Sequence, residues 1–168
     1  PYLLTFAIAE QVDFQMGVTT SDVPTYRGRL WPYNVNPPGS EPRWLTPFTP
    51  NLEDRWEEMV KRGCSGDATE RLLEAARLAL ELAKVADDPN TSEPLDGNLG
   101  FIRHDAALSI VFVSDEPDDS IDTGYTVPDY LAEYEKVKGR GNKDMLRIHG
   151  LIPDPSSGCE SSSNARYL

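Results

Sequence analysis

The sequence predicts an α/β fold in which a doubly wound, mostly parallel sheet is flanked by helices. Helix-like and strand-like patterns of apolar residues alternate along the chain. The segment 108–114 is almost continuously apolar and uncharged, which is typical of a parallel strand buried on both faces. With 168 residues and 39% hydrophobic composition, the chain has the size of one domain with a core. We therefore expect a single domain over residues 1–168, with ligands at the carboxyl edge of its sheet.

The first half of the chain is expected to supply helices, one strand and a proline-rich excursion. Apolar residues within 3–8 have helical spacing, and alternation over 14–18 predicts a strand that ends in the hydroxyl-rich turn 19–22. The proline- and glycine-rich segment 23–50 leaves room only for short edge strands near 28–32 and 43–46.

The rest of the chain continues the alternation. A helix is predicted over 52–62 with Asn51 as its N-cap, and a longer helix carries an apolar stripe. This stripe consists of Leu72, Leu73, Ala76, Leu80 and Ala83. After the strand 108–114 come a helix over 127–139 and a strand within 144–154, and residues 161–168 predict the beginning of another helix.

Composition excludes several classes of function. Twenty-eight acidic residues against 16 Lys and Arg give a net charge of −12, which argues against nucleic acid or an anionic membrane and favours cations or basic proteins. No apolar run reaches the roughly 18 residues of a membrane-spanning helix. Cys64 and Cys159 do not indicate a zinc site; they pair with each other, pair with another thiol or stay reduced.

The sequence does not predict an enzyme. No Ser-His-Asp, Cys-His or HExxH arrangement is visible, and no glycine-rich phosphate loop follows a strand. His104 precedes the strand 108–114 at the end opposite Asp115, and His149 is expected to be packed or hydrogen-bonded within its own strand. A hydrolase that uses Asp115 and Glu116 around a metal-bound water is the weakest alternative.

Four ordered blocks resemble the von Willebrand factor A-like (vWA) domains, in particular a bacterial branch of them. The blocks are "FQMGVTTSDV", "GCSGDATERLLEAARLAL", "GFIRHDAALSIVFVSDE", and "IHGLIPDPSSGC" followed by "ARYL". The resemblance implies a single vWA-like domain, incomplete at both ends. It also implies a divalent cation, Mg²⁺ or Ca²⁺, at the carboxyl edge of the sheet.

The cation motif of the family has three parts, of which this sequence matches two. Asp115 matches the aspartate that ends a central strand, and Thr69 matches the threonine, with Glu70 as its alternative. A possible secondary acidic cluster consists of Glu116, Asp118, Asp119 and Asp22. The third part, an Asp-x-Ser-x-Ser loop after the first strand, is not found; it lies in another chain, lies upstream, or has been lost.

Each assignment has a plainer alternative. Asp115 would only cap the end of its strand, and Thr69 would be the N-cap of the following helix. Glu116, Asp118 and Asp119 would form a solvated turn, and the turn that contains Asp22 needs no ligand.

The resemblance implies binding rather than catalysis. We expect a metal-ion-dependent protein-binding module for adhesion or assembly, located outside the cell, in the periplasm or on the outer surface of a bacterium. Its partner would be a protein, or a neighbouring chain that supplies the missing strand. The alternative is a structural subunit of an assembly with a vestigial or partner-completed metal site.

Overall fold

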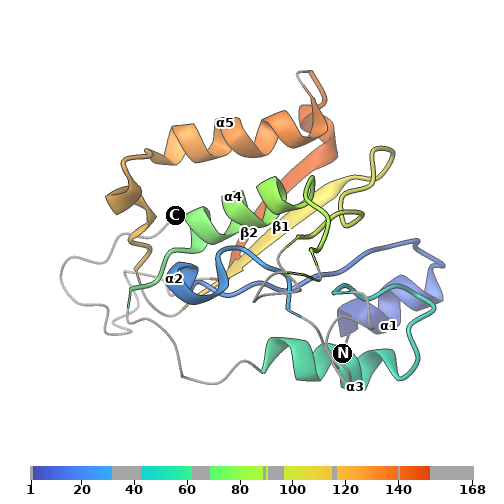
Figure 1. Cartoon of the computed structure of the whole chain (residues 1–168). Coiled ribbons are helices and arrows are strands. Elements are labelled where there is room, and N and C mark those ends of the chain that lie inside the picture. Colours follow the sequence, from blue (N-terminus) through green and yellow to red (C-terminus); the bar gives the residue numbers. More distant parts are fainter. Residues whose placement is uncertain are drawn as a thin grey trace, which may run out of the picture.

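The computed structural model of the protein describes residues 2–31, 43–61, 69–88, 90, 97–114, 117–139 and 141–151 (Figure 1). Within these ranges the chain forms helices and a small parallel sheet, so it is a mixed α/β protein. The elements in order are α1 (Tyr2–Ala9), α2 (Val23–Tyr26), α3 (Leu52–Val60), α4 (Leu72–Leu82), β1 (Leu108–Val113), the 3-10 helix η1 (Ser120–Thr123), α5 (Val127–Lys138), the 3-10 helix η2 (Lys143–Met145) and β2 (Leu146–Leu151).

The sheet is formed by β1 and β2, which pair in parallel from Leu108↔Leu146 to Val113↔Leu151. The connection between them passes through α5, as expected for a parallel pair. The strand predicted over 14–18 is reduced to one antiparallel bridge between Met16 and Leu45. The wider, doubly wound sheet stays a prediction.

One face of β1 is covered by α4 and α5, which run side by side in Figure 1. Leu108, Ile110 and Phe112 alternate along β1 and point to this face. The core there consists of Leu73, Ala76, Leu80, Leu108, Phe112, Tyr130 and Tyr134. Three members of the stripe predicted for the long helix are therefore buried in this core.

The opposite face of β1 is open to solvent within the described part of the chain. Val111 and Val113 are 53% and 67% exposed. The prediction that this strand is buried on both faces is therefore wrong here, because no described segment covers its second face. His149, in register with Val111, is exposed rather than packed.

A second core lies between α1, α3 and the Met16–Leu45 bridge. It contains Leu4, Leu45, Leu52 and Met59, with Phe14, Met16, Val18 and Trp56 packed against it. Asn51 precedes α3 in the left-handed conformation (φ 52°), and its side chain makes no capping hydrogen bond. Asn51 therefore stands at the predicted N-cap position but without a side-chain capping bond, and the carboxylates of Glu53 and Asp54 in the first turn interact favourably with the helix dipole.

The buried side chain of Asn98 joins the segment 28–30 to α4. Its amide nitrogen donates to the carbonyl oxygens of Gly28 and Ala79, both at 3.1 Å, and its oxygen accepts from the Leu30 N–H at 3.1 Å. Asn98 is fully buried. The Asn98 side chain therefore holds the segment 28–30 against α4.

None of the helices in the described ranges is both long enough and apolar enough to cross a membrane. Cys64, Cys159, Asp115, Glu116 and the helix start predicted over 161–168 lie outside the described residues.

Replacing Gly28 with alanine is expected to lower the free energy of unfolding by about 3 kcal/mol or more, because close packing adds to backbone strain. A Cβ on Gly28 would lie 2.4 Å from the main-chain nitrogen of Ala79, and φ is +78°. The control Gly124→Ala has φ +90° with nothing within 4 Å, so it should lose only about 1–2 kcal/mol from strain. Urea unfolding measures both losses. Equal losses would contradict the close contact of Gly28 with α4.

Candidate functional site

Three loops meet at the amino end of α4. They are 19–22, which precedes α2; 69–71, which leads into α4; and 117–120, which follows β1. The Arg71 N–H donates to the Ser21 carbonyl oxygen at 3.3 Å, and the Asp119 N–H donates to the Glu70 carbonyl oxygen at 2.7 Å. These main-chain bonds hold the three loops together.

The loop after β1 caps α4. The residue at the N-cap position, Arg71, has no side-chain acceptor, so the first N–H groups of the helix need partners from elsewhere. The Leu72 N–H donates to Asp118 Oδ1 and the Glu74 N–H to Ser120 Oγ, each at 2.9 Å and from 46 residues away. A carboxylate in this position also interacts favourably with the positive end of the helix dipole.

Asp118 is held in place by its own neighbour. Its Oδ1 also accepts from the Ser120 N–H at 3.1 Å and from the Ser120 hydroxyl at 2.6 Å. Asp118 is only 6% exposed and Ser120 is fully buried. The interpretation of Asp118 as part of a solvated turn is therefore wrong, because its carboxylate completes the hydrogen bonding of a helix end.

Three buried side-chain oxygens in these loops have no hydrogen-bond partner within the described residues: Thr19 Oγ1, Thr20 Oγ1 and Asp118 Oδ2. Leaving a buried polar group unsatisfied costs about 1–3 kcal/mol. Carboxylate and hydroxyl oxygens are the donors that Mg²⁺ and Ca²⁺ take in proteins. These oxygens are thus of the chemical type that a hard cation takes, and a buried water would satisfy them as well.

The structure brings together most of the described residues that the sequence singled out. Thr69 and Glu70 lie in the loop before α4, and Glu70 takes part through its carbonyl oxygen. Asp119 is exposed in the loop after β1. Asp22 is buried and caps α2 by accepting from the Thr25 N–H at 3.1 Å.

No three His, Cys, Asp or Glu side chains gather as a metal site within the described ranges. The oxygens without partners belong mainly to threonines, so hydroxyls rather than a carboxylate cluster characterise this region. The capping role of Ser120 was missed from sequence. The available signal was its Asp-x-Ser spacing from Asp118, which is common where side chains bond to local main chain.

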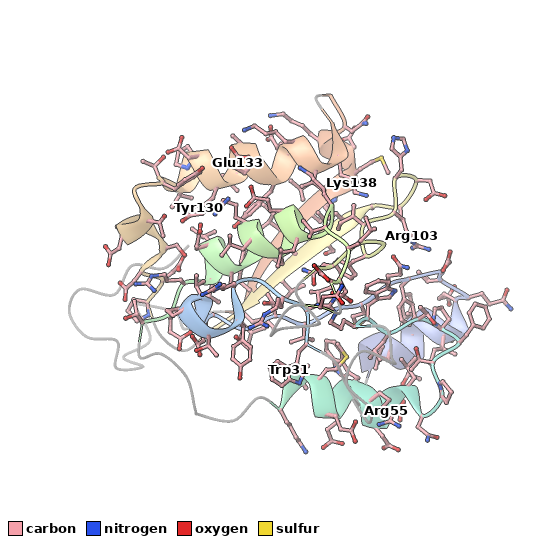
Figure 2. The ribbon with its side chains drawn as sticks, viewed as in Figure 1. Trp31, Arg55, Arg103, Tyr130, Glu133 and Lys138 are labelled. Carbon is pink, nitrogen blue, oxygen red and sulfur yellow. The ribbon has the colours of Figure 1, made fainter. Side chains whose placement is uncertain are left out.

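A buried polar network lies behind the cap and joins η1 and α5 to α4. Arg77 forms a double ion pair with Glu74, at 2.7 and 2.8 Å. The Tyr130 hydroxyl lies 3.0 Å from Glu74 Oε2 and 2.9 Å from the Ser120 carbonyl oxygen, on the side of α5 that faces α4 (Figure 2). Burial, opposed in part by a hydrogen bond to Thr123, raises the pKa of Tyr130 to about 12, so this hydroxyl stays protonated at neutral pH.

The carboxyl end of α5 is fixed as well. Lys138 donates to the Arg103 carbonyl oxygen at 2.6 Å, just before β1 begins (Figure 2). Burial lowers the pKa of the Lys138 ammonium group, against the opposing charge of Asp105. Both ends of α5 are therefore tied by polar contacts to the segments around β1.

Replacing Asp118 with alanine should lower the free energy of unfolding by about 2 kcal/mol, because the N-cap bond to Leu72 and both bonds from Ser120 are lost. The control Asp119→Ala removes an exposed carboxylate from the same loop and should change stability by no more than about 0.5 kcal/mol. Chemical denaturation measures both. The proposed cap is wrong if the two variants are equally stable.

Acid should destabilise the protein through Glu74. Burial raises the pKa of its carboxyl group, but the hydrogen bonds and charge of Arg77, with Tyr130, outweigh burial and hold the pKa below its ordinary value of 4.5. A carboxyl group whose pKa is lowered by folding stabilises the protein above its unfolded pKa and loses this contribution as the pH falls through its folded pKa. We expect the free energy of unfolding to decline below about pH 4.5 and to decline less in Glu74→Gln. Denaturation of the wild type and of Glu74→Gln across this pH range tests the prediction. An identical decline of the free energy of unfolding in both proteins would contradict it.

Comparisons with known proteins add no relative. No protein-family model matches the sequence, and neither the curated proteins nor the solved structures contain a match. The resemblance to vWA domains therefore stays a prediction from the four sequence blocks.

Proposed function

We propose that this protein is a cation-dependent protein-binding module of the vWA type, used in adhesion or assembly. The observation that supports it is the group of buried oxygens without partners, in the loops that meet at the amino end of α4. Buried oxygen donors are costly to leave empty, and a bound cation would remove that cost.

The residues that would hold the cation come from two sources. From the described residues we propose the hydroxyls of Thr19 and Thr20 and the second carboxylate oxygen of Asp118, because these oxygens are buried without hydrogen-bond partners. The sequence resemblance supplies Asp115 from the end of the strand, and Thr69 or Glu70 from the loop before α4. When bound, the cation offers Lewis acidity and open coordination positions.

The net charge supports a role for the cation in partner binding. A protein with a net charge of −12 repels an acidic partner at long range. A divalent ion is the largest local charge in such a site and reverses the local potential. An acidic side chain of the partner protein could then complete the coordination, which would make binding depend on the metal.

Binding fits the described residues better than catalysis. His104 and His149 are both exposed; His104 lies before β1 and His149 lies within β2, so neither belongs to the three loops. We propose Mg²⁺ or Ca²⁺ as the cation and the bacterial exterior or periplasm as the location.

Cation binding can be tested by thermal unfolding and calorimetry with MgCl₂ and CaCl₂, against EDTA. At about one hundred times Kd, the free energy of unfolding should rise by about 2.7 kcal/mol. In Thr19→Val/Thr20→Val the effect of the cation should vanish, while the variant in EDTA should be at least as stable as the wild type because two unsatisfied hydroxyls are gone. Asp115→Ala should also weaken binding.

The matched control is Asp119→Asn, which removes a nearby but exposed charge and should keep cation binding. Absence of binding to the wild-type protein would overturn the proposal. The alternative function, a structural subunit with a vestigial or partner-completed site, would then be the favoured interpretation.

A further inference from the structure

We propose that Tyr130 of α5 is a positioning residue for the cation: acting through Ser120, it fixes which oxygen of Asp118 is left to bind the ion. The role of Tyr130 rests on the proposed function, because it concerns the same site. It adds that cation binding at the amino end of α4 depends on the contact between α5 and α4.

The two carboxylate oxygens of Asp118 have different surroundings. Oδ1 accepts three hydrogen bonds, from the Leu72 N–H at 2.9 Å, the Ser120 N–H at 3.1 Å and the Ser120 hydroxyl at 2.6 Å. Oδ2 is buried and has no hydrogen-bond partner within the described residues. Each carboxylate oxygen offers about two lone pairs, so three donors saturate Oδ1. A cation would therefore reach this carboxylate through Oδ2 alone.

Ser120 is the residue that separates the roles of the two oxygens. The terminal torsion of an aspartate is broad and roughly two-fold, so the side chain of Asp118 does not fix its own orientation. Ser120 is fully buried, and its hydroxyl donates to Asp118 Oδ1 while it accepts from the Glu74 N–H at 2.9 Å. The place of Ser120 against α4 therefore decides how the carboxylate is turned.

Tyr130 holds Ser120 against α4 from the side of α5. Its fully buried hydroxyl lies 2.9 Å from the Ser120 carbonyl oxygen and 3.0 Å from Glu74 Oε2. A hydroxyl has one hydrogen, so it donates to one of these oxygens at a time. Ser120 and Glu74 are themselves joined by the bond from the Glu74 N–H, so Tyr130 holds the pair whichever oxygen takes the hydrogen.

The cation site and the position of α5 are thereby coupled. A carboxylate that turns presents its binding oxygen for only part of the time, and the apparent affinity for the cation falls by that fraction. Contacts that hold α5 on α4 therefore raise the affinity. Because coupling between two sites is reciprocal, a bound cation stabilises the contact between α5 and α4 by the same factor.

Calorimetry of the full chain with MgCl₂ and CaCl₂ tests the role of Tyr130. Tyr130→Phe should weaken the affinity for the cation by at least about fivefold, because Ser120 and Glu74 lose the hydroxyl that holds them. The matched control is Tyr134→Phe, since Tyr134 is also fully buried on α5 and its hydroxyl donates to the Leu73 carbonyl oxygen at 2.7 Å. Urea unfolding in EDTA should show similar losses of stability in both variants, while the control keeps the wild-type affinity.

Amide hydrogen exchange of α5, read by mass spectrometry, gives a second readout. The cation should slow this exchange in the wild type and in Tyr134→Phe, and should slow it less in Tyr130→Phe. Equal cation affinities in all three proteins would overturn the role of Tyr130 and leave the proposed function standing. A wild type that binds neither cation would overturn the proposed function, and the role of Tyr130 with it.

The separate roles of the two Asp118 oxygens are tested by Asp118→Asn. This variant keeps one oxygen for the Leu72 N–H and for Ser120, and it replaces Oδ2 with an amide nitrogen that only donates hydrogen bonds. Urea unfolding should show a smaller loss of stability than in Asp118→Ala, while calorimetry shows that cation binding is lost. If Asp118→Asn bound the cation as tightly as the wild type, Oδ2 would not be the binding oxygen.

Discussion

The capping of α4 by the loop after β1 is the interaction on which the rest of the described structure depends. Asp118 and Ser120 supply the acceptors that the amino end of α4 lacks. The same loop leads through η1 into α5, and Tyr130 returns from α5 to Glu74 and to the Ser120 carbonyl oxygen. The amino end of α4, the loop after β1 and α5 are therefore joined by one continuous set of hydrogen bonds beside the apolar core.

This arrangement explains why so many polar groups are buried beside an apolar core. Glu74 and Arg77 neutralise each other, and the hydroxyl of Tyr134 donates to the Leu73 carbonyl oxygen at 2.7 Å. Buried polar groups are tolerated when they are fully bonded and costly when they are not. Against that background, the oxygens of Thr19, Thr20 and Asp118 stand apart as groups still in need of a partner.

Local patterns predicted the elements of this chain better than its long-range contacts. The helices around 52–62 and 127–139 and the strand 108–114 were predicted within a few residues of α3, α5 and β1, because amphipathic periodicity is a local property. The strand predicted at 14–18 is only one bridge in the structure, because strand formation depends on a pairing segment that the local sequence does not identify. The cap from Asp118 and the buried bonds of Asn98 depend on residues far apart in sequence, where no periodic pattern exists. The cation assignment of Asp115, Thr69 and Glu70 stays a prediction.

The long separation between the capping loop and its helix has a consequence for folding. The segments that meet at the amino end of α4 are brought together only when contacts across 46 residues have formed. Contacts of high sequence separation carry a large loop-closure cost and form slowly. The grouping of buried oxygens near the amino end of α4 is thus a property of the assembled tertiary structure and has no counterpart in the isolated loops. A substitution that loosens α4 will therefore disperse this group of oxygens even when every residue of the three loops is unchanged.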